Sequence, residues 1–261
     1  MELLMDYATQ NNIILTINEK NYQGNYPLLK IIENDNVETM KLFIDYANQN
    51  NIILNINEKD YQGNYPLLKI VQNDNIEIMK LFMDFASQNN IILNINEKDH
   101  KGNYPLLKIV ENDNIKIMKL FLKYAIKNII ILEINEKDHQ GNYPLFYSTL
   151  NNNIEMTELL LKYIINNNIH ISEFDKINSG EFSSLLWSIK LNNMKLTSFL
   201  IHYAEKNNIN LNINEKDSLG NNFVLQAVSH NNIKLTKFLL NYATKHNILL
   251  KINEKDHQGN Y

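Results

Sequence analysis

The sequence contains no cysteine and no arginine, and it has only 7 glycines and 4 prolines in 261 residues. The absence of cysteine excludes disulfide bonds, thiol nucleophiles and cysteine-ligated zinc. All 25 basic residues are lysine, and against 29 acidic residues they leave a formal net charge of −4, which disfavours a uniformly basic nucleic-acid binder. Hydrophobic residues make up 44% of the chain, which is typical of a folded protein and too high for a disordered one.

Long apolar runs are also absent. No stretch reaches the roughly 18 consecutive apolar residues of a membrane-spanning helix, so no membrane partner is predicted. The first residues, Met1 to Asp6, lack the basic segment that opens a secretory signal. Together with the lack of cysteine, these features predict an intracellular protein, either cytoplasmic or nuclear.

The few glycines and prolines are regularly spaced, which indicates an internal repeat. The four prolines each follow a glycine by three residues, at Pro27, Pro66, Pro105 and Pro144. The seven glycines recur at one nearly constant interval, with a single interval longer by one, at Gly24, Gly63, Gly102, Gly141, Gly180, Gly220 and Gly259. A chain that places all its glycine and proline at one turn per repeat is predicted to be a solenoid.

The repeat that begins at Gly63 predicts two helices. Glycine accepts a positive φ in a turn and proline suits the first turn of a helix, so a short helix is expected over 67–72. Asn and Asp residues at 73–75 interrupt it, and a second helix is expected over 76–86. The second helix carries apolar residues at three- and four-residue steps, as one buried face requires: Ile78, Leu81, Phe82 and Phe85. A polar, turn-rich stretch at 96–102 then predicts a hairpin.

This pattern resembles an ankyrin repeat. The residues that match the family pattern are Asp60, Gly63, Pro66, Leu67, Ile78, Met79, Leu81, Phe82, Ile95, Asn96 and Asp99. Tyr65 stands where the family has Thr, Leu68 where it has His, and Asp74 where it has a glycine between the helices. Each repeat is about six residues longer than the usual ~33, and the extra length falls between Ala86 and Ile95, where we expect a longer second helix and a structured segment.

The resemblance implies an all-α solenoid, an ankyrin-like stack of helix-turn-helix repeats joined by hairpin-like loops. Tetratricopeptide and HEAT-like repeats have periods that bracket the glycine interval of this chain. Neither pattern explains Gly-x-x-Pro-Leu followed by a short first helix. Neighbouring repeats are expected to bury one another's apolar faces, so that stability is a sum of repeat and interface terms.

We expect a single array over residues 1–261. It divides into a partial leading repeat at 1–23, six repeats at 24–62, 63–101, 102–140, 141–179, 180–219 and 220–258, and the start of a truncated repeat at 259–261. Because the chain starts inside a second helix and stops before an expected proline, we expect either a fragment of a longer array or a truncated gene model.

The fifth and sixth repeats depart from the pattern. The fifth, beginning Gly180-Glu181-Phe182, has one extra residue and no proline, and the sixth has Asn222-Phe223-Val224 in place of Tyr-Pro-Leu. We therefore expect their first helices to begin less sharply. We also expect the C-terminal third of the chain to be locally less stable.

The resemblance places partner binding on the concave face, which hairpin tips and first helices form. At the tips, two residues before successive glycines, lie Tyr22, Tyr61, His100 and His139. On the first helices, six residues after most glycines, lie Lys30, Lys69, Lys108, Tyr147 and Trp187, the last shifted by one. One interpretation is a groove with a basic end and an aromatic centre. The other is that the lysines are solvated and Trp187 fills a gap in the irregular fifth repeat.

No catalytic, cofactor-binding or metal-binding residues are predicted. His100 and His139 are equivalent residues of adjacent repeats, and packed helices lie ~8–10 Å apart, too far to share a metal ion. The recurring Asn-Glu-Lys-Asp tetrad occurs in nearly every repeat, so we interpret its Asn and Asp as stiffening the hairpin and its Glu and Lys as solvated. The resemblance adds that Asn96 lies where ankyrin repeats can be hydroxylated.

The leading hypothesis is a non-enzymatic protein–protein interaction scaffold with an unidentified protein partner. One alternative is a helical repeat that binds nucleic acid through its lysine columns, which the net charge of −4 disfavours. Another is a recently duplicated repeat segment with no specific partner, which the near-identical copies over residues 24–140 suggest.

Overall fold

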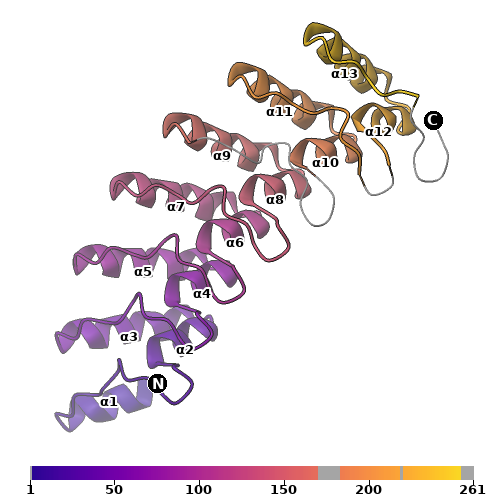
Figure 1. Ribbon diagram of the computed structural model, residues 1–261. Helices are drawn as coiled ribbons and strands as arrows, with labels where there is room; N and C mark the ends of the chain where they lie inside the picture. Colours follow the sequence, from indigo (N-terminus) through magenta and orange to yellow (C-terminus); the bar gives the residue numbers. More distant parts are fainter. Residues whose placement is uncertain (1, 170–182, 218–219, 254–261) are drawn as a thin grey trace. The chain divides into compact units, whose positions relative to one another are not determined.

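The computed structural model describes residues 2–169, 183–217 and 220–253. Within these ranges the chain forms thirteen α-helices and no β-strand (Figure 1). None of the helices in this part of the chain has both the length and the apolar composition that crossing a bilayer requires. The chain divides into two compact bodies, Met1–Glu133 and Ile134–Tyr261, which we describe separately.

The N-terminal body alternates short and long helices. In chain order they are α1 (Glu2–Gln10), α2 (Pro27–Glu33), α3 (Val37–Gln49), α4 (Pro66–Gln72), α5 (Ile76–Gln88), α6 (Pro105–Glu111) and α7 (Ile115–Lys127). The long helices α1, α3, α5 and α7 form one layer, and the short helices α2, α4 and α6 form a second (Figure 1). Hairpin loops extend beyond the short helices. This arrangement confirms the predicted stack of helix-turn-helix repeats.

The C-terminal body repeats the same alternation. Its helices are α8 (Pro144–Leu150), α9 (Ile154–Asn166), α10 (Ser184–Lys190), α11 (Met194–Lys206), α12 (Phe223–Ser229) and α13 (Ile233–Lys245). The short helices pack on one another, α8 on α10 and α10 on α12, and the long helices α11 and α13 are also in contact. The boundaries of individual repeats proposed above stay a prediction.

The turn between the helices of a repeat explains one departure from the family pattern. Asp74 adopts φ 60°, in the left-handed region, which Asp tolerates better than most residues with a side chain. The next residue, Asn75, caps α5 by accepting hydrogen bonds from the backbone amides of Glu77 and Ile78. Asp74 therefore takes over the conformational role of the family's glycine.

The other two departures strengthen the interior. Leu68 is fully buried and adds apolar contact where the family has a polar histidine. Tyr65 precedes α4 without capping it through its side chain. Its ring is buried, and its hydroxyl donates a 2.8 Å hydrogen bond to the carbonyl of Glu97 near the end of the same repeat. The tyrosine thus ties the start of α4 to the hairpin segment at the end of the same repeat.

The added length between Ala86 and Ile95 is built as expected. Helix α5 continues to Gln88, and Asn90 then adopts φ 54°. The backbone amide of Ile91 closes the helix end by donating to the carbonyl of Ala86 at 2.8 Å, in a Schellman-type arrangement. The structured segment that follows buries Leu93 and Ile95, so the extra residues enlarge the core.

The expectation that the proline-free short helices begin less sharply was wrong. Helix α10 is capped by Ser183, whose hydroxyl accepts from the backbone amide of Leu186 at 3.2 Å. Helix α12 is capped by Asn222, which accepts from two backbone amides at 3.1 and 3.0 Å. A side-chain cap therefore fixes the start of each helix where proline is missing. Residues 180–182, on which part of the expectation rested, lie outside the described residues.

Candidate partner-binding surface

The hairpin tips of the N-terminal body are joined from repeat to repeat. The backbone amide of His100 donates to the carbonyl of Gln62 at 3.2 Å, and that of Tyr61 donates to the carbonyl of Gln23 at 3.5 Å. Gly63 lies at φ +81°, and a Cβ added to it would lie 2.9 Å from the His100 nitrogen. Only glycine therefore permits both the turn and the close approach of the next tip.

The aspartate of the recurring tetrad stiffens each tip, as the sequence predicted. The carboxylate of Asp60 accepts from the backbone amides of Gln62 and Asn64, each at 2.8 Å, and from the Asn64 side chain at 2.8 Å. Asp60 is nearly buried. The tip is consequently a rigid platform for the side chains that project from it.

The lysine and glutamate of the tetrad are partly exposed to solvent, and they also form contacts that the sequence did not predict. Lys59 forms an ion pair with Glu97, and its ammonium lies 5.8 Å from the centre of the Tyr65 ring. The Lys20–Glu58 pair repeats this arrangement one repeat earlier. These side chains therefore link successive repeats through charge and cation–π contacts.

The structure brings four of the predicted partner-binding residues together. Tyr22, Tyr61, Lys30 and Lys69 line one hollow of about 450 Å³, together with Glu33. The two tyrosines project from adjacent tips and are 87% and 67% exposed. The two lysines come from α2 and α4, so the hollow spans two repeats.

The lysines of the short helices have carboxylates beside them. Glu33 accepts from Lys30 at 2.7 Å and lies 3.9 Å from Lys69. Lys108 on α6 pairs with Glu111 at 2.6 Å. The surface near the tips is therefore of mixed charge, and sequence reasoning overlooked the two glutamates, although their three-residue spacing from a lysine signals a pair on a helix.

The two tip histidines are exposed, His100 in the N-terminal body and His139 in the C-terminal body. Among the described residues, no group of three or more His, Cys, Asp or Glu side chains is placed to hold a metal ion. The histidines thus offer isolated polar contacts.

In the C-terminal body, Tyr147 and Trp187 are half-buried and both contact Phe146. The centres of the Phe146 and Trp187 rings lie 6.2 Å apart in an edge-on arrangement. The Tyr147 hydroxyl donates to Asp138 at 2.9 Å, and the ammonium of Lys190 lies 4.9 Å from the centre of the Trp187 ring. These aromatic residues therefore join the packing of α8 and α10 while keeping part of their surface open.

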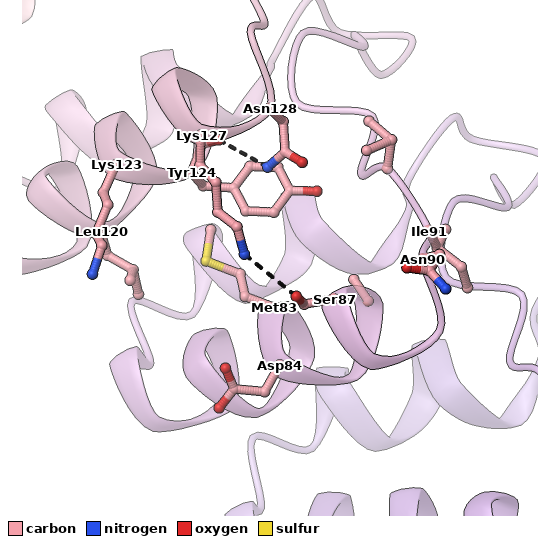
Figure 2. A pocket seen from close by; sticks show the side chains of 12 residues that line it. Met83, Asp84, Ser87, Asn90, Ile91, Leu120, Lys123, Tyr124, Lys127 and Asn128 are labelled. Atoms are coloured by element: carbon pink, nitrogen blue, oxygen red, sulfur yellow. Dashed lines mark hydrogen bonds between the residues drawn. The ribbon is translucent and has the colours of Figure 1, made fainter.

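A second hollow lies between the long helices α5 and α7 and was not found from the sequence. It has a volume of about 430 Å³, and its lining includes Met83, Leu120, Lys123, Tyr124 and Lys127 (Figure 2). The signal that could have revealed it is a difference in charge between repeats that are otherwise nearly identical.

Stacked two-helix repeats with rigid hairpin tips and an open surface along the short helices define a helical repeat protein of the solenoid class. Residues 88–172 match the family model described as ankyrin repeats (3 copies). The crystal structure of the ankyrin repeat domain of Bcl-3, "a unique member of the IkappaB protein family", has a similar fold, with a TM-score of 0.59 over 91% of each chain at 15% sequence identity. No curated protein matches this chain by sequence.

Residues 88–172 are thus ankyrin repeats, as the repeat pattern predicted, and the described part of the chain has the fold of an ankyrin repeat solenoid. The ankyrin repeat fold is generally a protein–protein interaction module, and proteins of this scaffold family are generally not enzymes.

Proposed function

We propose that this protein is a non-enzymatic scaffold that binds a partner protein on the concave face of the stack. The observation that carries the proposal is the pair of exposed tyrosines, Tyr22 and Tyr61, at adjacent rigid tips over one hollow. Tyrosine is a preferred anchor at protein interfaces because a large ring is buried at little cost in side-chain entropy. Tips held by internal hydrogen bonds also lose little freedom when a partner binds.

The charges around the hollow favour a protein partner over a nucleic acid. Lys30 and Lys69 both lie near Glu33, so a phosphate backbone following the lysines would meet a carboxylate. Nucleic-acid binding depends on phosphate neutralisation by basic side chains. A protein surface with its own mixed charges and an apolar patch complements this hollow better.

The test compares two tyrosine variants of the full chain in affinity capture from cells of the native source. The double variant Tyr22→Ser/Tyr61→Ser should lose the partner that the unchanged chain retains. The matched control is Tyr7→Ser on α1, because Tyr7 is also exposed, at 59%, but lies in the layer of long helices. Circular dichroism shows that each variant is folded.

Three results would contradict the proposal. The double variant could retain the partner as well as the control does, which would move the binding surface elsewhere. The unchanged chain could retain DNA or RNA in a salt-dependent manner, which would favour nucleic-acid binding. The unchanged chain could also enrich no protein above an unrelated repeat protein, as expected for a duplicated segment without a partner.

A further inference from the structure

The hollow between α5 and α7, which we name the α5–α7 groove, lies in the layer of long helices, whereas the hairpin tips lie beyond the short helices (Figure 1). We infer that this groove is a second docking site, and that it takes a protein segment in which acidic side chains flank an apolar one. The inference goes beyond the proposed function, because none of the residues that line this groove lines the hollow at the tips.

An apolar surface forms the base of the groove. Met83 from α5 and Leu120 and Tyr124 from α7 line it (Figure 2). The hydroxyl of Tyr124 accepts a 2.9 Å hydrogen bond from the backbone amide of Leu93, which holds the ring in place. Ile92 lines the groove while 55% exposed. This surface can receive one apolar side chain of a partner.

Positive charge dominates the rim of the groove. Lys123 and Lys127 are exposed and lie four residues apart on α7, hence on the same side of the helix. The ammonium of Lys127 reaches across to the hydroxyl of Ser87 on α5 at 3.5 Å (Figure 2). Of the residues that line the groove, only Asp84 carries a negative charge. Carboxylates of a bound segment could therefore form ion pairs with these two lysines beside the apolar base.

The same chain contains an internal reference with the opposite charge. The residues equivalent to Lys123 and Lys127 in the preceding repeat are Asp84 and Gln88, and Asp45 is equivalent to Asp84 one repeat earlier still. The long helices α3, α5 and α7 each have 13 residues. At these equivalent positions, the pair α3 and α5 has two carboxylates, Asp45 and Asp84, and no lysine. The α5–α7 groove has two lysines, Lys123 and Lys127, and one carboxylate, Asp84. Like charges repel, so of these two helix pairs the α5–α7 groove is the one that suits an acidic segment.

The shape of the groove favours a peptide over an anionic membrane. The hollow has a volume of about 430 Å³, and an extended segment can insert a side chain into it, whereas the flat surface of a bilayer cannot follow a concavity of this size. Asp84 within the groove would also repel lipid phosphates, while a peptide can place its carboxylates beside Lys123 and Lys127 alone.

The absence of cysteine from the chain allows a clean tethering experiment. Ser87→Cys places the only thiol in the α5–α7 groove, and the matched control Asn48→Cys places it at the equivalent position of α3. Each protein is equilibrated under mild reductant with three peptides supplied as mixed disulfides with a small thiol, Glu-Leu-Glu, Glu-Ser-Glu and Lys-Leu-Lys, so that exchange at the cysteine joins the peptide and releases the small thiol. Intact mass spectrometry measures the fraction that forms a mixed disulfide.

The Glu-Leu-Glu peptide should label Ser87→Cys about fivefold more than Asn48→Cys, the shift that two exposed ion pairs produce together. Adding Lys123→Asp and Lys127→Gln, the residues that α5 carries at these positions, should abolish the preference. Glu-Ser-Glu should label Ser87→Cys less than Glu-Leu-Glu does. The Tyr22→Ser/Tyr61→Ser change should leave all labelling unchanged, which separates this site from the proposed function.

Four results would overturn the inference. Glu-Leu-Glu could label the two cysteines equally, or Lys-Leu-Lys could label Ser87→Cys more than Glu-Leu-Glu does. Glu-Leu-Glu and Glu-Ser-Glu could label Ser87→Cys equally. Finally, the unchanged chain could co-sediment with phosphatidylserine–phosphatidylcholine vesicles, and the two lysine substitutions could abolish this co-sedimentation. The last result would assign the two lysines to a membrane surface. Circular dichroism of every variant excludes unfolding as the cause.

Discussion

Ile129, just after α7, has a backbone conformation that is unfavourable for isoleucine. Its φ is 57°, in the left-handed region, and the side chain is 91% exposed. The equivalent residues of the two preceding repeats, Asn51 and Asn90, have φ 53° and 54°. The conformation is imposed by the helix end, because the backbone amide of Ile130 donates to the carbonyl of Ala125 at 2.9 Å.

The substitution Ile129→Asn should stabilise the protein. A left-handed conformation costs a residue with a Cβ roughly 1–2 kcal/mol, and Asn tolerates it best among such residues because its side chain forms local hydrogen bonds. Since Ile129 is exposed, replacing it loses almost no buried apolar area. We expect the free energy of unfolding to rise by about 1 kcal/mol. The reciprocal change Asn90→Ile should lower it by about the same amount.

Native-state hydrogen exchange at the backbone amide of residue 130 is the most direct assay, because a repeat array does not always unfold in a single step. A gain of about 1 kcal/mol slows exchange at this amide roughly fivefold, and urea unfolding followed by circular dichroism gives the global effect. Ile129→Ala, which keeps the Cβ but removes the branch, should give a smaller gain. An unchanged or faster exchange rate in Ile129→Asn, together with a neutral Asn90→Ile, would refute the reasoning.

Three further changes test other parts of the stack. Gly63→Ala should lower the free energy of unfolding by at least about 1 kcal/mol, because φ is +81° and the new Cβ would lie 2.9 Å from the His100 nitrogen; an unchanged urea midpoint would contradict this. Burial raises the pKa of Tyr65 above its ordinary value, and the negative charge of Glu97 raises it further. The neutral phenol therefore stabilises the fold fully below about pH 10, and this stability is lost as the pH rises further. Tyr65→Phe should therefore be less sensitive to pH above 10 in a circular dichroism titration, and alkaline unfolding at the same pH as the unchanged chain would argue against it. Asn222→Ala should lower the free energy of unfolding by about 1 kcal/mol because it removes the α12 cap, whereas Asn222→Ser should keep the cap. Equal hydrogen-exchange rates at the capped amides in both variants would count against the cap.

The start of each short helix shows what local sequence can and cannot reveal. Proline at the first position of α4 predicted the start of that helix correctly. Ser183 and Asn222 fix α10 and α12 equally well through hydrogen bonds within three residues. Both capping residues are visible in the sequence, but the prediction considered only the missing proline and therefore missed these helix starts.

The candidate partner-binding surface was partly predictable. Tyr22 and Tyr61 were expected at the tips, and both project there with most of their surface exposed. The role of Glu33 beside Lys30 and Lys69 was not foreseen, because Lys69 belongs to the following repeat and meets Glu33 only when repeats stack.

The sequence by itself determined the repeat length, the two helices of each repeat, the turn positions and the stacked architecture. Glycine, proline, asparagine and the spacing of apolar residues act on the chain within a few residues of themselves, so a single repeat suffices to read them. Only the tertiary structure decided which distant residues meet: the hydroxyl of Tyr65 with the carbonyl of Glu97 within one repeat, and, between adjacent repeats, Lys59 with Glu97 and the lysines of α7 with the apolar surface of α5. Each of these contacts joins residues far apart in the chain, and only the folding of each repeat and the stacking of repeats bring them together.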